Sequence, residues 1–307
     1  MPHVFGPVPS RRLGLSMGID LIPAKTCTYD CLYCQVGRTT SKILDPQAFV
    51  PVGDVIAELE KRLQKSAPDV ITLAGSGEPT LYSEIDKLIS SIKEITKTDL
   101  VLLTNGALLF RHEVRKRVLE ADIIMPTLTT TSDKTFKRIH RPHPGLSLDA
   151  VLEGLETLRQ DFKGRLFLEV VLLAGINDTE KEIEGLKQAI ERIDPDKIQL
   201  NTVVRPPADQ GAISVDRKRL EDIKIYFGEK AEIVAGGPKL GESVEEQSLI
   251  RTLLDMAARR PLRSVDISCA LNLSMADVES LVKGLLIKGY LRSQEHGGEV
   301  YYATCRQ

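Results

Sequence analysis

The sequence predicts an α/β fold in which a parallel sheet is covered by helices and followed by a small helical domain. Between about residues 19 and 228, short apolar runs alternate with longer amphipathic stretches, giving six strand–helix pairs in a row. This order is typical of parallel strands with helices outside the sheet. Because six units fall short of the eight in a closed (β/α)8 barrel, the pattern agrees with an open barrel or a flat doubly wound sheet.

The predicted strands are short and rich in Val, Ile and Leu, as expected for parallel strands buried on both faces. They cover Gly18–Pro23, Val70–Ala74, Leu100–Thr104, Ile123–Leu128, Leu166–Leu173 and Lys197–Val203. Polar residues that follow these strands are expected at the carboxyl edge of the sheet, where such folds bind ligands.

Amphipathic periodicity predicts the helices between the strands. They cover Val52–Ser66, Ser83–Thr96, His112–Glu120, Ser147–Gln160, Thr179–Ile193 and Asp216–Gly228. Asn177 stands three residues before Glu180, so we expect it to cap the helix that contains Glu180.

The sequence changes character towards its end. Residues 229–245 contain Gly236-Gly237-Pro238 and are expected to form a linker or a last edge strand. Three helices are then predicted over Glu246–Ala258, Ser264–Leu271 and Ser274–Lys288, and two short strands flank His296-Gly297-Gly298, a good hairpin signal. We therefore predict a first domain over 1–245 and a winged-helix domain over 246–307.

Composition places the chain among ordinary globular proteins. Of its 307 residues, 42% are apolar and 27% are charged, and the formal net charge is −2. This charge gives no global attraction to nucleic acid or anionic membrane. No apolar run approaches the ~20 residues of a membrane helix, and the stretch from Met1 to Val4 does not resemble a signal peptide.

Three cysteines near the start carry the strongest chemical signal. Cys27, Cys31 and Cys34 are spaced C-x3-C-x2-C, and no fourth cysteine follows closely. Three thiolates hold three corners of a four-iron cluster and leave the fourth iron open for a small ligand, whereas a structural zinc ion takes four protein ligands. The alternatives are a zinc site or a chance cluster. Grouped thiols without a disulfide framework indicate a reducing cytoplasm.

Cys269 and Cys305 lie more than two hundred residues downstream and are expected to behave as small apolar side chains. Tyr29 and Tyr33 are placed to shield a cluster from solvent, although simple loop packing explains them equally well.

The stretch from Lys25 to Cys34, KTCTYDCLYC, resembles the cluster loop of the radical S-adenosylmethionine (SAM) superfamily. The resemblance implies an open six-unit barrel and a [4Fe-4S] cluster whose open iron binds SAM. One electron then cleaves the sulfonium, and the 5′-deoxyadenosyl radical abstracts a hydrogen atom from the substrate. The resemblance also implies an electron donor such as flavodoxin or ferredoxin, and it implies that Tyr33 lies against the adenine of SAM.

A turn after the second predicted strand strengthens the resemblance. Gly75-Ser76-Gly77-Glu78 is similar to the family's GGE motif, with Ser76 in place of the second glycine. The resemblance implies that Gly75, Gly77 and Glu78 contact the SAM amino group. Further polar residues are candidates for SAM or substrate contacts: Asn105 and Thr127 at the ends of the third and fourth strands, Glu169 inside the fifth and Asn201 on the sixth. The alternative for Asn105 is an ordinary strand-ending turn, and the alternative for Glu169 is a structural ion pair.

Basic residues near the predicted strand ends suit a phosphate or carboxylate on the substrate, with solvated surface charge as the alternative. The substrate candidates are Arg11, Arg12, His140, Arg141, His143 and Arg205. The two histidines are candidate general acids or loop-packing residues, and neither is predicted to bind metal.

The segments Gly6–Arg12, Ile139–Pro144 and Gln199–Thr202 resemble the branch of this superfamily grouped with tRNA wyosine synthases. Those enzymes carry a second set of cluster cysteines that this chain lacks, so only the branch is suggested. The first hypothesis is therefore SAM cleavage followed by hydrogen abstraction from an RNA base or from a peptide or protein.

The alternative is an iron–sulfur sensor whose winged helix binds DNA or protein. From Glu246 to Gln307 the chain has eight Lys or Arg and seven Asp or Glu, a net of +1. A reader of the major groove usually carries a clear basic patch, so peptide or protein docking is favoured over DNA, with an RNA contact still open.

Overall fold

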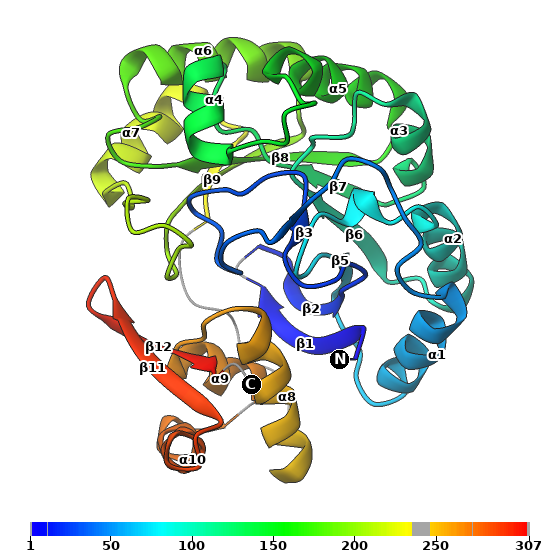
Figure 1. Ribbon diagram of the computed structural model, residues 1–307, viewed down its shortest axis with the longest axis vertical. Coiled ribbons are helices and arrows are strands. Elements are labelled where there is room, and N and C mark those ends of the chain that lie inside the picture. Colours follow the sequence, from blue (N-terminus) through cyan, green and yellow to red (C-terminus); the bar gives the residue numbers. More distant parts are fainter. Residues whose placement is uncertain (1, 11, 235–245, 272, 306–307) are drawn as a thin grey trace.

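The computed structural model describes residues 2–10, 12–234, 246–271 and 273–305, and a curved sheet of eight strands forms its frame (Figure 1). In spatial order the strands are β1 (Val4–Ser10), β2 (Gly14–Ile19), β5 (Val70–Leu73), β6 (Asp99–Thr104), β7 (Ile123–Pro126), β8 (Arg165–Leu172), β9 (Lys197–Thr202) and β10 (Ala231–Ile233). Only β1 and β2 pair antiparallel, and all other neighbours are parallel.

Helices cover the outer side of this sheet (Figure 1). They are α1 (Val52–Leu63), α2 (Ile85–Ile95), α3 (His112–Val118), α4 (Asp133–His140), α5 (Leu148–Asp161), α6 (Glu180–Ile193) and α7 (Arg217–Phe227), and a 3-10 turn, η1, spans Pro79–Leu81. The α/β fold with a mostly parallel sheet is therefore confirmed. No helix in the described ranges is long and apolar enough to cross a membrane.

Side chains alternate between the two faces of the strands. Ile71, Leu100 and Ile124 join the large core beneath the helices, whereas Val70 and Val101 belong to a smaller apolar cluster on the opposite face. The helices therefore cover one face of the sheet and leave the other face to line the interior of the open barrel.

Two local predictions were wrong. The first parallel strand is Gly14–Ile19 rather than Gly18–Pro23. Thr179, not Asn177, caps α6 by accepting a hydrogen bond from the Glu182 amide. The Asn177 side chain is buried instead and donates to two backbone carbonyls, at 2.7 and 2.9 Å.

β1 and α4 are among the elements that were not predicted. β1 contains Pro7 and Pro9, which read as turn residues in sequence, and the strand lies at the edge of the sheet, where proline is tolerated. α4 has only eight residues and is too short for a clear apolar period, but Ser132 caps it and Phe136 and Ile139 bury its inner face.

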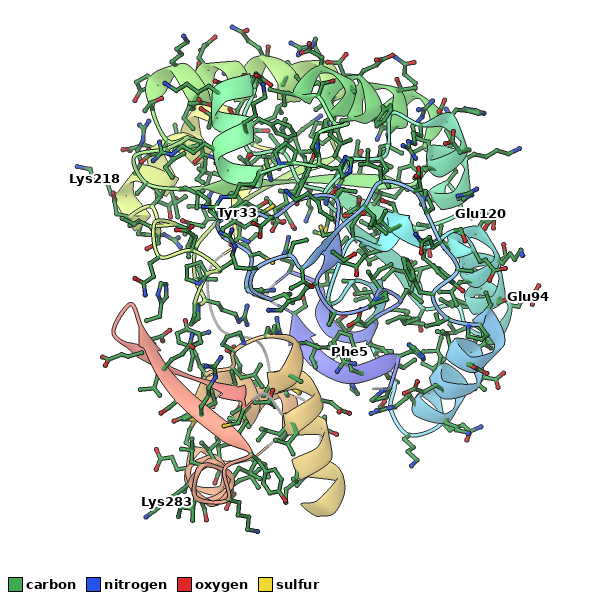
Figure 2. All side chains as sticks on the ribbon, in the orientation of Figure 1. Phe5, Tyr33, Glu94, Glu120, Lys218 and Lys283 are labelled. Carbon is green, nitrogen blue, oxygen red and sulfur yellow. The ribbon has the colours of Figure 1, made fainter. Side chains whose placement is uncertain are left out.

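The end of the chain forms three helices and a hairpin: α8 (Glu246–Arg259), α9 (Ser264–Leu271), α10 (Met275–Ile287), β11 (Leu291–His296) and β12 (Glu299–Thr304). The predicted hairpin is present, and Gly297 and Gly298 both have positive φ at its turn. These elements share an apolar core that also takes in Val8 of β1, with Phe5 packed against it. Figure 2 labels Phe5 on β1, beside the C-terminal helices.

Candidate functional site

The loop that carries the three cysteines lies at the carboxyl end of β2 and is held by backbone hydrogen bonds on two sides. Towards β5, the Lys25 amide donates to the Ser76 carbonyl (2.8 Å) and the Glu78 amide donates to the Thr26 carbonyl (3.3 Å). Towards α4, the amides of Asp30 and Leu32 donate to the carbonyls of His140 and Ile139, at 2.8 and 2.9 Å. The loop is therefore fixed between the end of a strand and the end of a helix.

The thiols of Cys27, Cys31 and Cys34 are free and partly shielded from solvent. Burial raises the pKa of Cys27 to about 12 and also raises the pKa of Cys31 and Cys34. The charges of Cys27 and Cys34 further raise the pKa of Cys31, so the three thiols act on one another. This donor set stabilises its thiolates only when a bound cation compensates their charge.

The donor set fits an iron–sulfur cluster better than a single metal ion. Within the described ranges, no three His, Cys, Asp or Glu side chains converge as they would around one ion. A cluster is larger than an ion and holds its thiolates farther apart, with each thiolate on its own iron.

The Tyr29 hydroxyl gives a second, independent test of the fit. It is buried, it has no hydrogen-bond partner, and the charges of Cys31, Glu78 and Cys27 act on it. An unpaired buried hydroxyl costs about 1–3 kcal/mol. A group bound among the cysteines would supply the missing partner.

Glu78 links the ends of β5 and β6 beside this loop. Its Oε1 accepts hydrogen bonds from the Thr80 hydroxyl (2.7 Å) and the Thr104 hydroxyl (2.6 Å), and its Oε2 accepts one from the Asn105 amide (2.8 Å). Burial raises the pKa of the carboxyl, and the hydrogen bonds from Asn105, Thr104 and Thr80 act in the opposite direction. Because a carboxylate oxygen has two acceptor sites, Oε2 retains room for one more donor.

The side chain of Asn105 connects the same strand end to the cysteine loop. Its Nδ2 donates to the Thr28 hydroxyl at 2.8 Å and lies 3.5 Å from the sulfur of Cys27. Its Oδ1 accepts from the Ala107 amide, which orients the side-chain amide.

Gly75 and Gly77 stand where the backbone passes too close to its neighbours for a side chain. A Cβ on Gly77 would lie 2.0 Å from the Thr26 carbonyl oxygen, and a Cβ on Gly75 would lie 2.2 Å from the Asp20 carboxyl carbon. Asp20 accepts from the Ser76 amide (3.1 Å) and hydroxyl (2.6 Å), so the serine in this turn has a defined partner.

His140 lies behind Cys31 and is buried. Its Nδ1 is 3.1 Å from the Cys31 sulfur, and its Nε2 is 2.6 Å from the Thr129 hydroxyl. Burial lowers the pKa of His140 to about 3, so the ring is neutral at pH 7. A neutral ring has one donor and one acceptor. When Cys31 is the thiolate of a bound cluster it only accepts, so Nδ1 would then donate to the sulfur and Nε2 would accept from the Thr129 hydroxyl.

Aromatic rings pack around this histidine. The centroid of Tyr29 lies 4.7 Å and that of Tyr33 lies 6.0 Å from the His140 ring. Tyr33 also contacts a small apolar cluster that contains Leu32 and Ile139. These contacts place both tyrosines at the inner side of the cysteine loop.

A separate polar group lies just after β7 and within β8 and β9. Glu169, in β8, accepts hydrogen bonds from Thr127 (3.0 Å) and Asn201 (2.9 Å) and forms an ion pair with Arg12 at 2.7 Å. The structure thus brings together three of the polar residues predicted as candidate contacts and one of the predicted basic residues.

The remaining basic residues are dispersed. Arg141 forms ion pairs with Asp209 (2.6 Å) and Asp30 (3.8 Å), so it ties the cysteine loop to another loop. His143 accepts from the Gly145 amide at the rim, and Arg205 lies by the C-terminal helices. Arg11 lies outside the described residues.

Both ring nitrogens of His140 are engaged inside the protein, which favours the loop-packing alternative, and its contact with substrate stays a prediction. Arg141 forms ion pairs with Asp30 and Asp209, and its substrate role likewise stays a prediction. Sequence reasoning missed Asp20 and Thr104, which hold Ser76 and Glu78. Their positions at the ends of β2 and β6 were the only available signal.

Comparison with known families and proteins gives a consistent result. The model of the radical SAM superfamily matches residues 21–188. A UPF0026 protein of Methanocaldococcus jannaschii is 32% identical over 98% of this chain and 96% of its own length. A protein named GTPase Obg of Brachyspira hyodysenteriae is 36% identical over 98% of this chain, but the chain spans only 45% of that protein.

Solved structures share the fold at low sequence identity. A radical SAM methyltransferase from Sphaerobacter thermophilus matches with a TM-score of 0.51 and 17% identity, covering 71% of this chain and 65% of that one. Native anSMEcpe with bound AdoMet matches with a TM-score of 0.52 and 16% identity, covering 71% and 63%.

Proposed function

The chain belongs to the radical SAM superfamily, and from this premise we propose that it cleaves SAM reductively at a [4Fe-4S] cluster and abstracts hydrogen from a substrate. The family implies both an iron–sulfur cluster and SAM. When bound, the cluster would supply one electron to the sulfonium of SAM, which yields a 5′-deoxyadenosyl radical.

One observation carries this proposal. Three thiols of a single loop lie next to Glu78 and the buried, unpartnered hydroxyl of Tyr29, at the carboxyl end of a parallel sheet. We propose Cys27, Cys31 and Cys34 as the cluster ligands. The absence of a fourth cysteine nearby leaves one iron for SAM.

The surrounding residues suggest how the chain orients SAM. Glu78 keeps one acceptor site on Oε2, and we propose that this site receives the SAM ammonium group beside the close turn of Gly75 and Gly77. Asn105 would hold the loop against this turn through Thr28. On the opposite side, we propose that Tyr33 contacts the adenine.

The group of Thr127, Glu169 and Asn201 is proposed to contact the ribose or the adenine. Its members already bond to one another and to Arg12, which sets the orientation of the Glu169 carboxylate before SAM binds. His140 would act as a positioning residue that donates to Cys31 and supports its thiolate form.

We further propose that residues 1–245 form the SAM-cleaving domain and that 246–307 form a winged-helix domain. The hairpin and the apolar core of α8, α9 and α10 support this division, because among the described residues before 246 only Val8 and Phe5 of β1 contribute to that core. An RNA base or a peptide or protein remains the proposed substrate class, with reduced flavodoxin or ferredoxin as electron donor in a cytoplasmic setting.

Anaerobic reconstitution tests the proposed function. We expect the loaded protein, given SAM and dithionite, to form 5′-deoxyadenosine, and a Cys31→Ala variant to form none. A fully loaded protein that binds SAM but makes no 5′-deoxyadenosine, with RNA or peptide added, would contradict the proposal.

A further inference from the structure

A cavity of about 170 Å³ lies inside the open barrel, between the sheet and α8. Its sheet side comes from β2, β5 and β6, through residues such as Ser16, Thr72 and Leu103, and it reaches Gly75 in the turn assigned to SAM. Its other side comes from α8 and from the loop after β9. The full lining includes Arg12, Arg205, Met256, Arg259 and Arg260.

The charged side chains among the described residues that line this cavity are all positive. Four arginines contribute to the cavity, and no aspartate or glutamate is among the described residues that line it. Three of these arginines pair with carboxylates that do not line the cavity: Arg12 with Glu169, Arg205 with Asp266 and Arg259 with Asp20. The wall of the cavity is therefore cationic.

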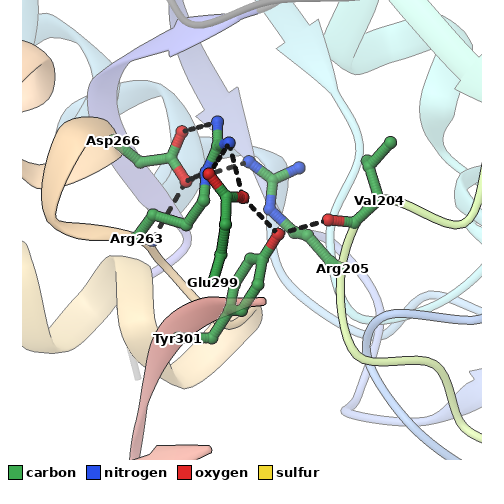
Figure 3. Close-up of polar contacts among 6 residues, drawn as sticks. All are labelled: Val204, Arg205, Arg263, Asp266, Glu299 and Tyr301. Carbon is green, nitrogen blue, oxygen red and sulfur yellow. Dashed lines mark hydrogen bonds and ion pairs between the residues drawn. The ribbon is translucent and has the colours of Figure 1, made fainter. Parts of the chain in front are cut away.

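Arg205 is held by a polar network that joins the β9 loop to the C-terminal elements (Figure 3). Only 5% of its side chain is exposed, and its closest carboxylate contact is Asp266 at 3.6 Å, which exceeds hydrogen-bond distance. Its Nε has no hydrogen-bond partner. The Tyr301 hydroxyl donates to the Val204 carbonyl at 2.5 Å and fixes the loop that carries Arg205.

Arg259, on α8, repeats this arrangement. Its side chain is 7% exposed, it lies 4.1 Å from the centroid of the Phe5 ring, and its nearest approach to Asp20 is 3.7 Å. Two of its terminal donors reach the carbonyls of Asp255 and Pro2, but Nε, the atom that faces Asp20, has no hydrogen-bond partner. Since Asp20 also holds Ser76, α8 is connected directly to the SAM turn.

Unpartnered donors on buried cations are uncommon in folded proteins. Burial lowers the pKa of both Arg205 and Arg259, which reflects the cost of removing their charges from water. Each of these two guanidinium groups lies within ion-pair range of one carboxylate but keeps an Nε without a hydrogen-bond partner. The cavity therefore offers free donors for one further anion, because a guanidinium fits the oxygens of a phosphate or carboxylate.

We propose that this cavity binds a phosphate or carboxylate group of the substrate, and that α8 forms one wall of the substrate site through Arg259. The inference rests on the proposed SAM cleavage, because the cavity borders Gly75. The volume of the cavity suits one phosphate or carboxylate group and the few atoms bonded to it. The rest of the substrate would extend towards the opening of the barrel.

Anion binding to the full, reconstituted chain in the presence of SAM tests the proposal. We expect inorganic phosphate or acetate to bind in calorimetry, and the tighter of the two identifies a phosphate-bearing or a carboxylate-bearing substrate. Arg205→Gln and Arg259→Gln should each weaken binding at least tenfold. Arg192→Gln, which removes an exposed arginine paired with Glu156 on the outer helices, should leave it unchanged.

A measurement on the wild-type chain covers the case in which these variants fail to fold. Phenylglyoxal modification of Arg205 and Arg259, read by peptide mass spectrometry, should fall at least threefold when the binding anion is present. The proposal is overturned if neither anion binds, if both glutamine variants bind as tightly as wild type, or if the anion protects neither arginine. Retained anion binding without 5′-deoxyadenosine formation would refute the proposed function and leave the anion site intact.

Discussion

Replacing Gly77 with alanine tests the packing of the cysteine loop against the turn after β5. The new Cβ would lie 2.0 Å from the Thr26 carbonyl oxygen and 2.5 Å from the Ile22 Cγ2. Real Cβ contacts are not this short, and a backbone carbonyl moves less easily than the end of a side chain. Overpacking of this kind costs about 1–3 kcal/mol. Relief of the clash would shift Thr26, and therefore Cys27 next to it.

We expect Gly77→Ala to unfold at lower urea concentration than wild type in the apo form, measured by circular dichroism. We also expect it to retain less iron and sulfide per chain after reconstitution. Gly53→Ala is the matched control, because no heavy atom lies within 4 Å of its added Cβ and alanine favours a helix by roughly 0.5–1 kcal/mol. A Gly77→Ala protein with wild-type stability and full iron content would refute the reasoning.

Three other predictions concern the cluster ligands, the histidine behind them and the C-terminal contact. Cys31→Ala should lose the iron–sulfur absorbance, whereas Cys305→Ala, at an exposed cysteine, should keep it. His140→Phe should keep iron but lower the reduction potential in an electron paramagnetic resonance titration, since the hydrogen bond to the Cys31 sulfur is lost, and His143→Phe should not. Burial raises the pKa of Asp266, but the hydrogen bonds of Arg263 and the charges of Arg205 and Arg263 outweigh it and hold this pKa below its usual range. Its stabilisation is complete above the ordinary aspartate pKa of about 3.9 and is lost as pH falls through the lower folded-state value. The protection factors of the α9 amides, which correct for the pH dependence of intrinsic exchange, should therefore fall on acidification below about pH 3.9 in wild type and be low already at neutral pH in Asp266→Asn.

Each of these three predictions can be refuted separately. Full cluster absorbance in Cys31→Ala would remove that residue from the ligand set. An unchanged potential in His140→Phe would show that the contact at 3.1 Å has no electronic effect. Equal exchange of α9 in Asp266→Asn and wild type at neutral pH would mean that the network in Figure 3 does not hold the C-terminal elements.

The Gly75–Glu78 turn shows where sequence reasoning succeeded. The cysteine spacing and this turn are local patterns, and both follow directly on predicted strands. Parallel strands bring their carboxyl ends to one edge, so the prediction that they share a site needed only the strand order. Glu78 and Asn105 accordingly meet at the ends of β5 and β6, joined by a hydrogen bond of 2.8 Å.

Sequence reasoning failed where one polar side chain has several possible partners. His140 is the last residue of α4, a helix too short to predict, and a loop with Pro142 and Pro144 follows it. Its contact with Cys31, 109 positions away, therefore had no local signal. Arg141 and Arg205 looked alike in sequence, as basic residues beside prolines. Only the packed structure gives Arg141 two carboxylate partners and gives Arg205 one, Asp266, with its Nε buried and without a hydrogen-bond partner.

By itself, the sequence determined the chemistry of the loop and the class of fold, because thiol spacing and apolar periodicity are properties of neighbouring residues. The tertiary structure alone decided which distant side chains complete the site. Asp20, His140 and Arg259 come from the end of a strand, a helix and the C-terminal elements, and each reaches the site through packing across the chain. Such contacts depend on how whole elements fit together, and a sequence pattern records only the elements.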